Sequence, residues 1–361
     1  MNVNVSQFQR KLIRWFSEHQ RRLPWRLRGN PYRIFVVEIM LQQTQIKTVI
    51  PYYKRWLKTF PTIDVLAKAP LDQVLKLWEG LGYYTRARNL HKASQIVVER
   101  FGGKIPSDLE ILQSLPGIGR YTAGAIASIA FQKPVPLVDG NVARVFSRIF
   151  YLRKDISKPE TQKMLYTLAE KLVPAKEPGI FNQALMELGS LICIPETPKC
   201  SICPVQSLCL AFRKGDASKL PIKSNGVRVK KIEMVVGILE KNGRLLVRRR
   251  PERGIWGGLW EIPGTVRAKD ETLEEALAQE FKETLGISIQ IHKKEDPIVH
   301  QFTHRNATIH PFTLTPKTGT GLPRRPVPKF KNSRTCWATQ KALKKLSFPV
   351  PHQKILKAIP V

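Results

Sequence analysis

Acidic residues, cysteines and long apolar runs are all scarce in this chain of 361 residues. Only 28 Asp and Glu stand against 60 Lys and Arg, which gives a formal net charge of +32. No apolar run approaches the roughly 20 residues that a membrane span needs, and the polar N-terminus lacks the apolar core of a signal peptide. Five cysteines are too few and too clustered for a disulfide scaffold. These absences favour a cytoplasmic protein over a membrane or secreted one.

The positive charge is spread over the whole chain. Residues up to Leu220 include 33 basic and 16 acidic side chains, and the remainder includes 27 and 12. Such an excess is self-repulsive and indicates a polyanionic partner. The composition is 42% hydrophobic, which suits packed cores and argues against a disordered basic protein. Nucleic acid is therefore the expected partner, and an acidic membrane surface is the weaker alternative.

The sequence divides into two domains. Residues 1–217 contain one helical pattern after another, separated by turns with Pro and Gly, and predict an all-α domain. Residues 218–231 are rich in bases and turn residues and predict a linker. Residues 232–361 mix short β-type runs with two helical stretches and predict an α+β domain. The expected strands are Met234–Leu239, Leu245–Arg249, Ile287–His292, Ile298–Phe302, Ala307–Leu314 and Thr335–Ala338, and the expected helices there are Leu273–Leu285 and Gln340–Leu346.

Four cysteines lie close together near the end of the first domain. Cys193, Cys200, Cys203 and Cys209 have the spacing C-x6-C-x2-C-x5-C. Four thiolates in a reducing compartment indicate a shared metal centre. Zinc is bound by Cys₄ sites that often contain a C-x2-C pair, and an iron–sulfur cluster is also held by four thiolates. The spacing alone leaves both open.

A glycine-containing turn joins two helical patterns at residues 115–123. Gly117 and Gly119 let the chain turn tightly and expose backbone N–H groups at the start of the next helix. Such amides suit a phosphate oxygen and have no base preference. The segment is a helix-hairpin-helix candidate for binding a DNA backbone, with an ordinary turn between helices as the alternative.

Two carboxylates stand out. Glu38 interrupts an apolar helical run between Ile34 and Leu41, so it is expected on an apolar face, where burial favours the protonated form of a carboxyl. A general acid needs that form near neutral pH. Asp139 lies twenty residues after Gly119, just before a helical pattern, and its local alternative is a helix N-cap.

Together these motifs resemble the helix-hairpin-helix, Gly-Pro-Asp superfamily of DNA glycosylases. Members with this cysteine loop are similar to endonuclease III and to the MutY family of adenine DNA glycosylases. Residues 37–44 and 78–84 resemble the MutY family, and the resemblance extends over both domains. The bifunctional enzymes have a catalytic lysine where this chain has Tyr121.

The resemblance implies removal of adenine mispaired with 8-oxoguanine or with guanine. It implies that Glu38 protonates the adenine, that Asp139 stabilises the sugar cation and that Tyr121 hydrogen-bonds near Asp139. It implies one 4Fe–4S cluster on the four cysteines. By resemblance the adenine pocket is lined by Trp25, Arg26 and Gln183, and Gln43 and Tyr83 wedge into the opposite stack.

The second domain resembles the Nudix fold, through residues 254–264. Its metal-binding box is degraded, because residues 279–284 lack one of the expected carboxylates and the arginine. Loss of a ligand weakens a magnesium site, so pyrophosphate hydrolysis is not expected. The MutY family uses this fold to read 8-oxoguanine with a Phe-Ser-His segment, whose counterpart here is Phe302, Thr303 and His304.

The expected protein is a monomeric, monofunctional glycosylase that acts on double-stranded DNA. It is expected in the cytoplasm of a bacterium, associated with the nucleoid. Two alternatives remain: an endonuclease III-like glycosylase and lyase acting on oxidised pyrimidines, and a non-catalytic DNA-binding protein. The first would require a lysine at Tyr121. The second gives no reason for a carboxyl inside an apolar helix at Glu38.

Overall fold

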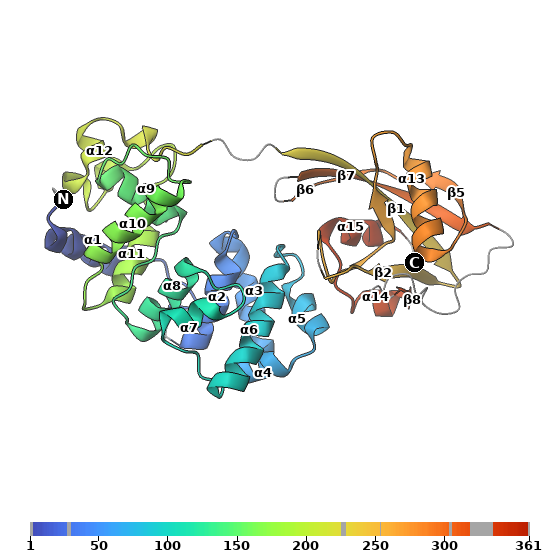
Figure 1. The fold of residues 1–361 in the computed structure, drawn as a ribbon, viewed down its shortest axis with the longest axis horizontal. Helices are drawn as coiled ribbons and strands as arrows, with labels where there is room; N and C mark the ends of the chain where they lie inside the picture. Colours follow the sequence, from blue (N-terminus) through green and yellow to red (C-terminus); the bar gives the residue numbers. More distant parts are fainter. Residues whose placement is uncertain are drawn as a thin grey trace. The chain divides into compact units, whose positions relative to one another are not determined.

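A computed structural model describes residues 3–26, 30–224, 229–252, 254–302, 305–317 and 335–359. The chain, coloured along its sequence in Figure 1, forms two compact units. The first unit comprises residues 1–69 and 89–225, and the second comprises residues 70–88 and 226–361. Within the described residues, no helix is long and apolar enough to cross a membrane.

The first unit is helical, as predicted. Side-chain caps begin several helices: Asn4 accepts the N–H of Gln7, and Asn30 accepts that of Arg33 ahead of a first-turn proline. The helices are α1 (Val5–His19), α2 (Pro31–Leu41), α3 (Ile46–Thr59), α4 (Ile63–Lys68), α6 (Thr85–Phe101, which begins in the second unit), α7 (Leu109–Ser114), α8 (Arg120–Phe131), α9 (Gly140–Ile149), α10 (Pro159–Leu172), α11 (Pro178–Leu191) and α12 (Leu210–Arg213).

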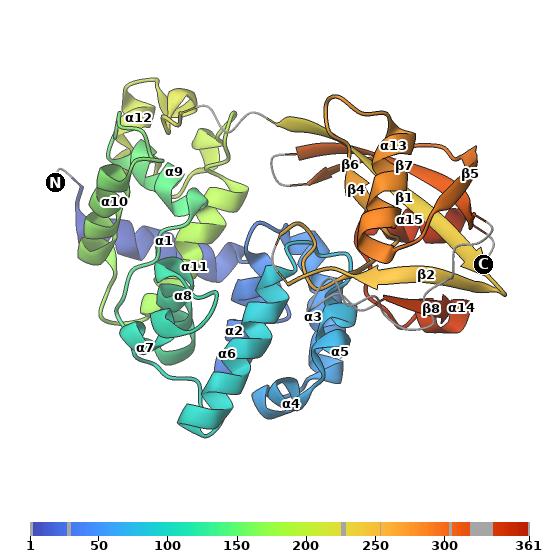
Figure 2. The ribbon, with the colours of Figure 1, turned by 45° about the vertical axis from the view of Figure 1, so that its right-hand side comes forward.

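Helix α8 is the centre of the first unit, packed against both α2 and α11 (Figure 2). Its residues 122–129 are all buried, and most are small. A side chain at Gly124 would lie 2.4 Å from the carbonyl oxygen of Pro136, so the close approach of the chain there requires glycine. This dense packing fixes the helices that bring the predicted site residues together.

The second unit is a mixed β-sheet with helices on both faces, consistent with the predicted α+β domain. The strands are β1 (Lys230–Lys241), β2 (Arg244–Arg249), β3 (Trp260–Glu261), β4 (Gly264–Val266), β5 (Ile289–Lys294), β6 (Ile298–Phe302), β7 (Arg305–Pro316) and β8 (Thr335–Thr339). Strand β1 pairs in parallel with β7 and antiparallel with β2 and β4.

Alternate residues of β1 enter two separate cores. Met234, Val236 and Ile238 pack with α14 (Gln340–Leu343) and α15 (Val350–Ala358), whereas Val235 and Leu239 pack with α13 (Leu273–Glu280) and the π-helical turn after it. Figures 1 and 2 both show α13 and α15 on opposite sides of β1. The strand is therefore buried on both faces, as its nearly continuous apolar sequence requires.

The segment 70–88, with helix α5 (Leu71–Trp78), packs in the second unit although it lies early in the chain. Lys76 donates to the carbonyl of Leu346 at 2.8 Å, and Glu79 accepts the N–H of Phe348 at 2.8 Å. The predicted domain boundaries, 1–217, 218–231 and 232–361, assign residues 70–88 to the first domain, whereas the structure groups them with the second unit. Strand β1 also begins at Lys230, inside the predicted linker.

Candidate active site and cysteine loop

One pocket of the first unit contains most of the predicted catalytic and adenine-binding residues. It encloses about 1190 Å³, part of it open to solvent. Helix α2 contributes Glu38, α8 contributes Tyr121, and Asp139 enters from the start of α9. The wall is completed by Trp25, Arg26 and Gln183 together with Arg21, Asn141, Met186, Glu187 and Ser190.

Glu38 is buried in the pocket wall, with 4% of its surface exposed. Burial raises its pKa to about 7, with Asp139 adding to the rise, while the hydroxyl of Tyr121 and the charge of Arg26 oppose it. At neutral pH such a carboxyl is protonated in a large share of molecules. The group can therefore donate a proton where an ordinary glutamate cannot.

Tyr121 has a different partner from the one expected. Its hydroxyl donates to Glu38 Oε2 at 3.0 Å and lies 3.3 Å from Met186 Sδ, whereas the expectation placed its hydrogen bond near Asp139. Tyr121 lies in the first turn of α8, the helix that packs directly on α2. Burial, followed by the negative charges of Glu38 and Asp139, raises the tyrosine pKa well above its usual value, so Tyr121 remains a donor.

Asp139 caps helix α9 and also faces the pocket. It accepts the N–H of Val142 at 2.7 Å and the amide of Asn141 at 2.9 Å. Burial raises its pKa, and these two hydrogen bonds act in the opposite direction. Arg144 donates to Asn141 Oδ1 at 2.8 Å and to the carbonyl of Cys193 at 2.8 Å. The N-cap role and the proposed chemical role are thus compatible, because the cap holds the carboxylate in place.

A buried ion-pair network on the pocket wall was not predicted. Glu187 is 1% exposed and binds Arg21 at 2.6 Å and Arg26 at 3.0 Å. Burial opposes its charge, but the hydrogen bonds from both arginines outweigh this and lower its pKa to about 2. Glu187 interrupts the apolar run of α11 between Leu185 and Leu188, which is the signal that identified Glu38.

The predicted adenine-binding residues are all held by local contacts. Trp25 is buried and packs edge-on against Tyr53, with ring centroids 5.3 Å apart. Arg26 lies over the ring of Phe16 at 5.0 Å in addition to its ion pair. Gln183 donates to the carbonyl of Gly179 at 3.1 Å. The pocket wall is therefore preorganised.

The predicted hairpin lies between α7 and α8. Gly117 has a φ of 79°, and a side chain there would lie 2.8 Å from the Cβ of Asn89, so both conformation and space require glycine. Gly119 is the N-cap residue of α8. Exposed amides at a helix N-terminus suit an anion.

The two predicted wedge residues share an unusual backbone conformation. Gln43 has a φ of 55° and Tyr83 a φ of 47°, values that non-glycine residues adopt rarely. Gln43 is exposed beside the pocket-lining Thr44, and Tyr83 is 43% exposed in the second unit. An exposed tyrosine in a strained turn is available to contact a partner.

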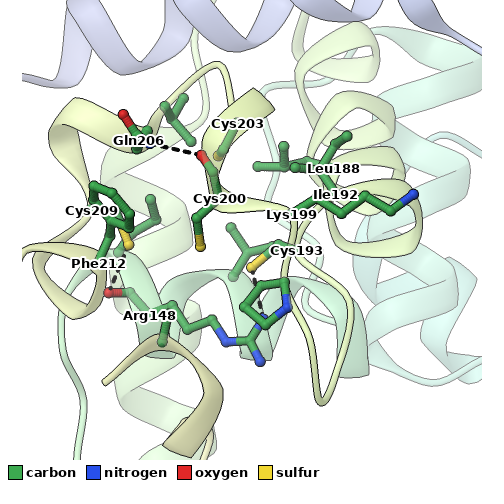
Figure 3. Close-up of a pocket in the computed structure, with 15 residues that line it drawn as sticks. Arg148, Leu188, Ile192, Cys193, Lys199, Cys200, Cys203, Gln206, Cys209 and Phe212 are labelled. Atoms are coloured by element: carbon green, nitrogen blue, oxygen red, sulfur yellow. Dashed lines mark hydrogen bonds between the residues drawn. The ribbon is translucent and has the colours of Figure 1, made fainter. Parts of the chain in front are cut away.

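The four cysteines line a second cavity of about 380 Å³ in the first unit. Figure 3 shows the sulfur atoms of Cys193, Cys200 and Cys209 turned toward one space, with Cys203 above it. Buried Arg148 donates to Cys193 Sγ at 3.3 Å and to the carbonyl of Ile194 at 2.7 Å. Among the described residues, no three His, Cys, Asp or Glu side chains surround a point suited to a single metal ion.

The degraded Nudix box carries an ion-pair cluster. Arg248 binds Glu280 at 2.6 Å and Glu261 at 2.8 Å, and Arg250 also pairs with Glu261. Glu280, one of the two carboxylates that the box retains, is thus neutralised by a guanidinium group. Of the predicted lesion-reading residues, Phe302 ends β6, and Thr303 and His304 lie outside the described residues.

Comparisons with known proteins agree with both halves of the fold. A model of the HhH-GPD superfamily of base excision DNA repair proteins matches residues 36–174, and a NUDIX domain model matches residues 234–358. The adenine DNA glycosylase of Homo sapiens is 37% identical over 368 residues, which is 86% of this chain and 67% of that protein. That of Buchnera aphidicola subsp. Schizaphis graminum (strain Sg) is 33% identical over 98% of this chain and 99% of that protein.

Two solved structures resemble the helical part. A thermostable thymine-DNA glycosylase has a TM-score of 0.54 and 30% identity, covering 58% of this chain and 97% of its own. An endonuclease III in a non-covalent DNA complex has a TM-score of 0.50 and 25% identity, covering 59% of this chain and 98% of its own.

Proposed function

This chain belongs to the adenine DNA glycosylase family, and from that premise we propose that it excises adenine paired with 8-oxoguanine or with guanine. It is a DNA glycosylase of base excision repair and binds DNA. The observation that carries the proposal is that the buried Glu38, with a pKa of about 7, and the half-buried Asp139 line one pocket. The base must leave the duplex before it can reach such a pocket.

The two carboxyls divide the work. Glu38 protonates a ring nitrogen of the flipped adenine, which makes the base a better leaving group, and then assists the attacking water. Asp139, held by its N-cap hydrogen bonds, is the ionised group that stabilises the positive charge developing on the sugar. Two carboxylates with separate roles are also the basis of glycoside hydrolysis.

Tyr121 supports the acid and cannot act as a lyase. Its hydroxyl fixes the orientation of Glu38 through the 3.0 Å hydrogen bond. Cleavage of the DNA strand by β-elimination requires an amine that forms a Schiff base with the opened sugar, and a phenol cannot form one. We therefore assign a monofunctional enzyme rather than an endonuclease III-like one.

The residues around the second cavity fit an iron–sulfur cluster. Four thiols border one cavity, and Arg148 donates a hydrogen bond to one of the sulfurs. Hydrogen bonds of this kind to ligand sulfurs are part of the surroundings of iron–sulfur clusters. Cys193, Cys200, Cys203 and Cys209 would hold one 4Fe–4S cluster, which would cross-link this loop to the end of α11. Its role here is to fix the fold of the loop, with no step of base excision assigned to it.

The second unit is proposed to read the base opposite the adenine. Phe302 ends β6, in the unit that also carries Tyr83, and Thr303 and His304 come next in the sequence. 8-Oxoguanine differs from guanine by a hydrogen at N7 and an oxygen at C8, a difference that one or two hydrogen bonds can distinguish. The pocket is complete within one chain, which supports action as a monomer; a cytoplasmic location at the nucleoid stays a prediction.

The test is the base released from a panel of mismatched duplexes. We expect free adenine from A:8-oxoguanine and, more slowly, from A:G, with no release of oxidised pyrimidines. Release of an oxidised pyrimidine with strand cleavage would support the bifunctional alternative. Tight binding with no base released from any duplex would support the non-catalytic one.

A further inference from the structure

The loop between β2 and β3, which carries Trp256, has no room for a side chain at Gly257. A side chain at Gly257 would lie 2.1 Å from the carbonyl oxygen of Glu252. The N–H of Gly258 donates to Pro251 at 3.0 Å, and that of Leu259 donates to Trp256 at 3.1 Å. The backbone is therefore closely packed around Gly257.

Trp256 is held in an uncommon conformation in this loop. Its φ is 54°, which is a genuine outlier for a bulky residue and must be stabilised by its surroundings. Its ring contacts Phe302 with centroids 5.1 Å apart and His352 edge-on at 5.6 Å. Phe302 also stacks on His300 at 5.9 Å. The ring of Trp256 thus packs against the ring of Phe302 and supports it.

One charged side chain from a distant part of the chain anchors this loop. Arg88, on the first turn of α6, donates to the carbonyl oxygen of Gly257 and to Thr85 Oγ1 at 2.9 Å. Both partners belong to the second unit. Arg88 is half-buried, and burial lowers its pKa, with Glu252 opposing the change. A guanidinium group taken partly out of water needs such contacts to offset its desolvation.

We propose that Arg88 is a positioning residue for discrimination of the base opposite adenine: by holding Gly257, it fixes Trp256 against Phe302. The inference rests on the proposed function of the Phe302 segment. Arg88 lies five residues after Tyr83, in the same unit. The same side chain therefore ties the turn that carries Tyr83 to the loop that supports Phe302.

The functional test compares single-turnover rates of adenine release at saturating full-length enzyme. Arg88→Met keeps the aliphatic length and removes the donors, and we expect the ratio of the A:8-oxoguanine rate to the A:G rate to fall about tenfold. Arg88→Lys keeps one charged donor and should restore most of the ratio. Lys92→Met removes an exposed charge one turn further along α6 and should leave the ratio unchanged.

A double-mutant cycle separates positioning from general damage. If Arg88 acts through Phe302, the double variant Arg88→Met, Phe302→Ala should discriminate no worse than Phe302→Ala alone. Amide hydrogen exchange in residues 254–259 should be faster in Arg88→Met than in the wild type, and unchanged in Lys92→Met. Trp256→Phe should retain more discrimination than Trp256→Ala, because a smaller ring still supports Phe302.

The outcomes are distinguishable. An unchanged rate ratio in Arg88→Met, with a lowered ratio in Phe302→Ala, would overturn this inference and leave the proposed function intact. An unchanged ratio in Phe302→Ala would overturn both the lesion-reading role and the inference. If the wild type released no adenine, the proposed function would fail. Unchanged amide hydrogen exchange in residues 254–259 of Arg88→Met would by itself refute the anchoring role of Arg88.

Discussion

The protonation of Glu38 predicts how adenine release depends on pH. With a pKa of about 7, half of the Glu38 carboxyls are protonated at pH 7, and about one in eleven at pH 8. If the protonated form is the acid, kcat/KM should fall about fivefold from pH 7 to pH 8 and about tenfold more to pH 9. The quantity kcat/KM is suitable because it reports ionisations of the free enzyme.

Tyr121→Phe should move this profile in a defined direction. The tyrosine hydroxyl hydrogen-bonds to Glu38 and lowers its pKa against the larger effect of burial. A hydrogen bond to a charged group contributes about 1.5–3 kcal/mol, so its removal should shift the alkaline limb upward by about one to two pH units. The maximal rate should also fall, because the carboxyl loses the group that orients it.

The assay is adenine release at limiting DNA and constant ionic strength, from pH 5.5 to about 9. Tyr151→Phe is the matched control: it removes a hydroxyl that donates to Asp216, away from the pocket, and should leave the profile unchanged. A wild-type rate that stays flat or rises between pH 7 and pH 9 would refute the general-acid assignment. An unshifted limb in Tyr121→Phe would refute the role of the hydrogen bond.

Three further predictions concern other parts of the chain. Strand cleavage after base release should require added alkali, because residue 121 is a tyrosine; cleavage as fast as base release without alkali would contradict this. The purified protein should be brown and contain about four irons, and Cys200→Ser should lower the iron content more than the rate of bond breaking per DNA bound; a colourless protein with stoichiometric zinc would contradict the cluster. Arg248→Met should lower the free energy of unfolding of the second unit by about 3 kcal/mol in thermal or urea unfolding, because the half-buried Glu280 would lose its guanidinium partner and the buried Glu261 would keep only Arg250; a change below about 1 kcal/mol would show that the cluster contributes little.

Functional residues can be predicted from the sequence when the signal lies within one helix or one loop. Glu38 is visible because a carboxyl breaks an apolar helix, and the four cysteines because of their spacing. The same signal is present at Glu187, but its meaning depends on Arg21 and Arg26, which are more than 160 residues away. The partner of Tyr121 is likewise set by the packing of α8 on α2, which no local pattern contains.

The arrangement of the second unit also depends on contacts far apart in the chain. The sequence of segment 70–88 predicts a helix of the first domain, whereas contacts such as its hydrogen bonds to Leu346 and Phe348 place it with the sheet. The sequence analysis does not predict helix α15, in which Pro349 is the N-cap and Pro351 lies in the first turn. Strand β1 extends to Lys230 because its pairing with β7 overrides local composition.

The most direct test of the central claim is adenine release from an A:8-oxoguanine duplex by Glu38→Gln under single-turnover conditions. The substitution preserves size and removes the acidic proton, so we expect duplex affinity to stay within about threefold of the wild type while the rate falls by at least about 10³-fold. The rate of adenine release should also fall sharply in Asp139→Asn, since a neutral amide stabilises the sugar cation poorly. Near-normal adenine release by Glu38→Gln would contradict the assignment of Glu38 as the general acid.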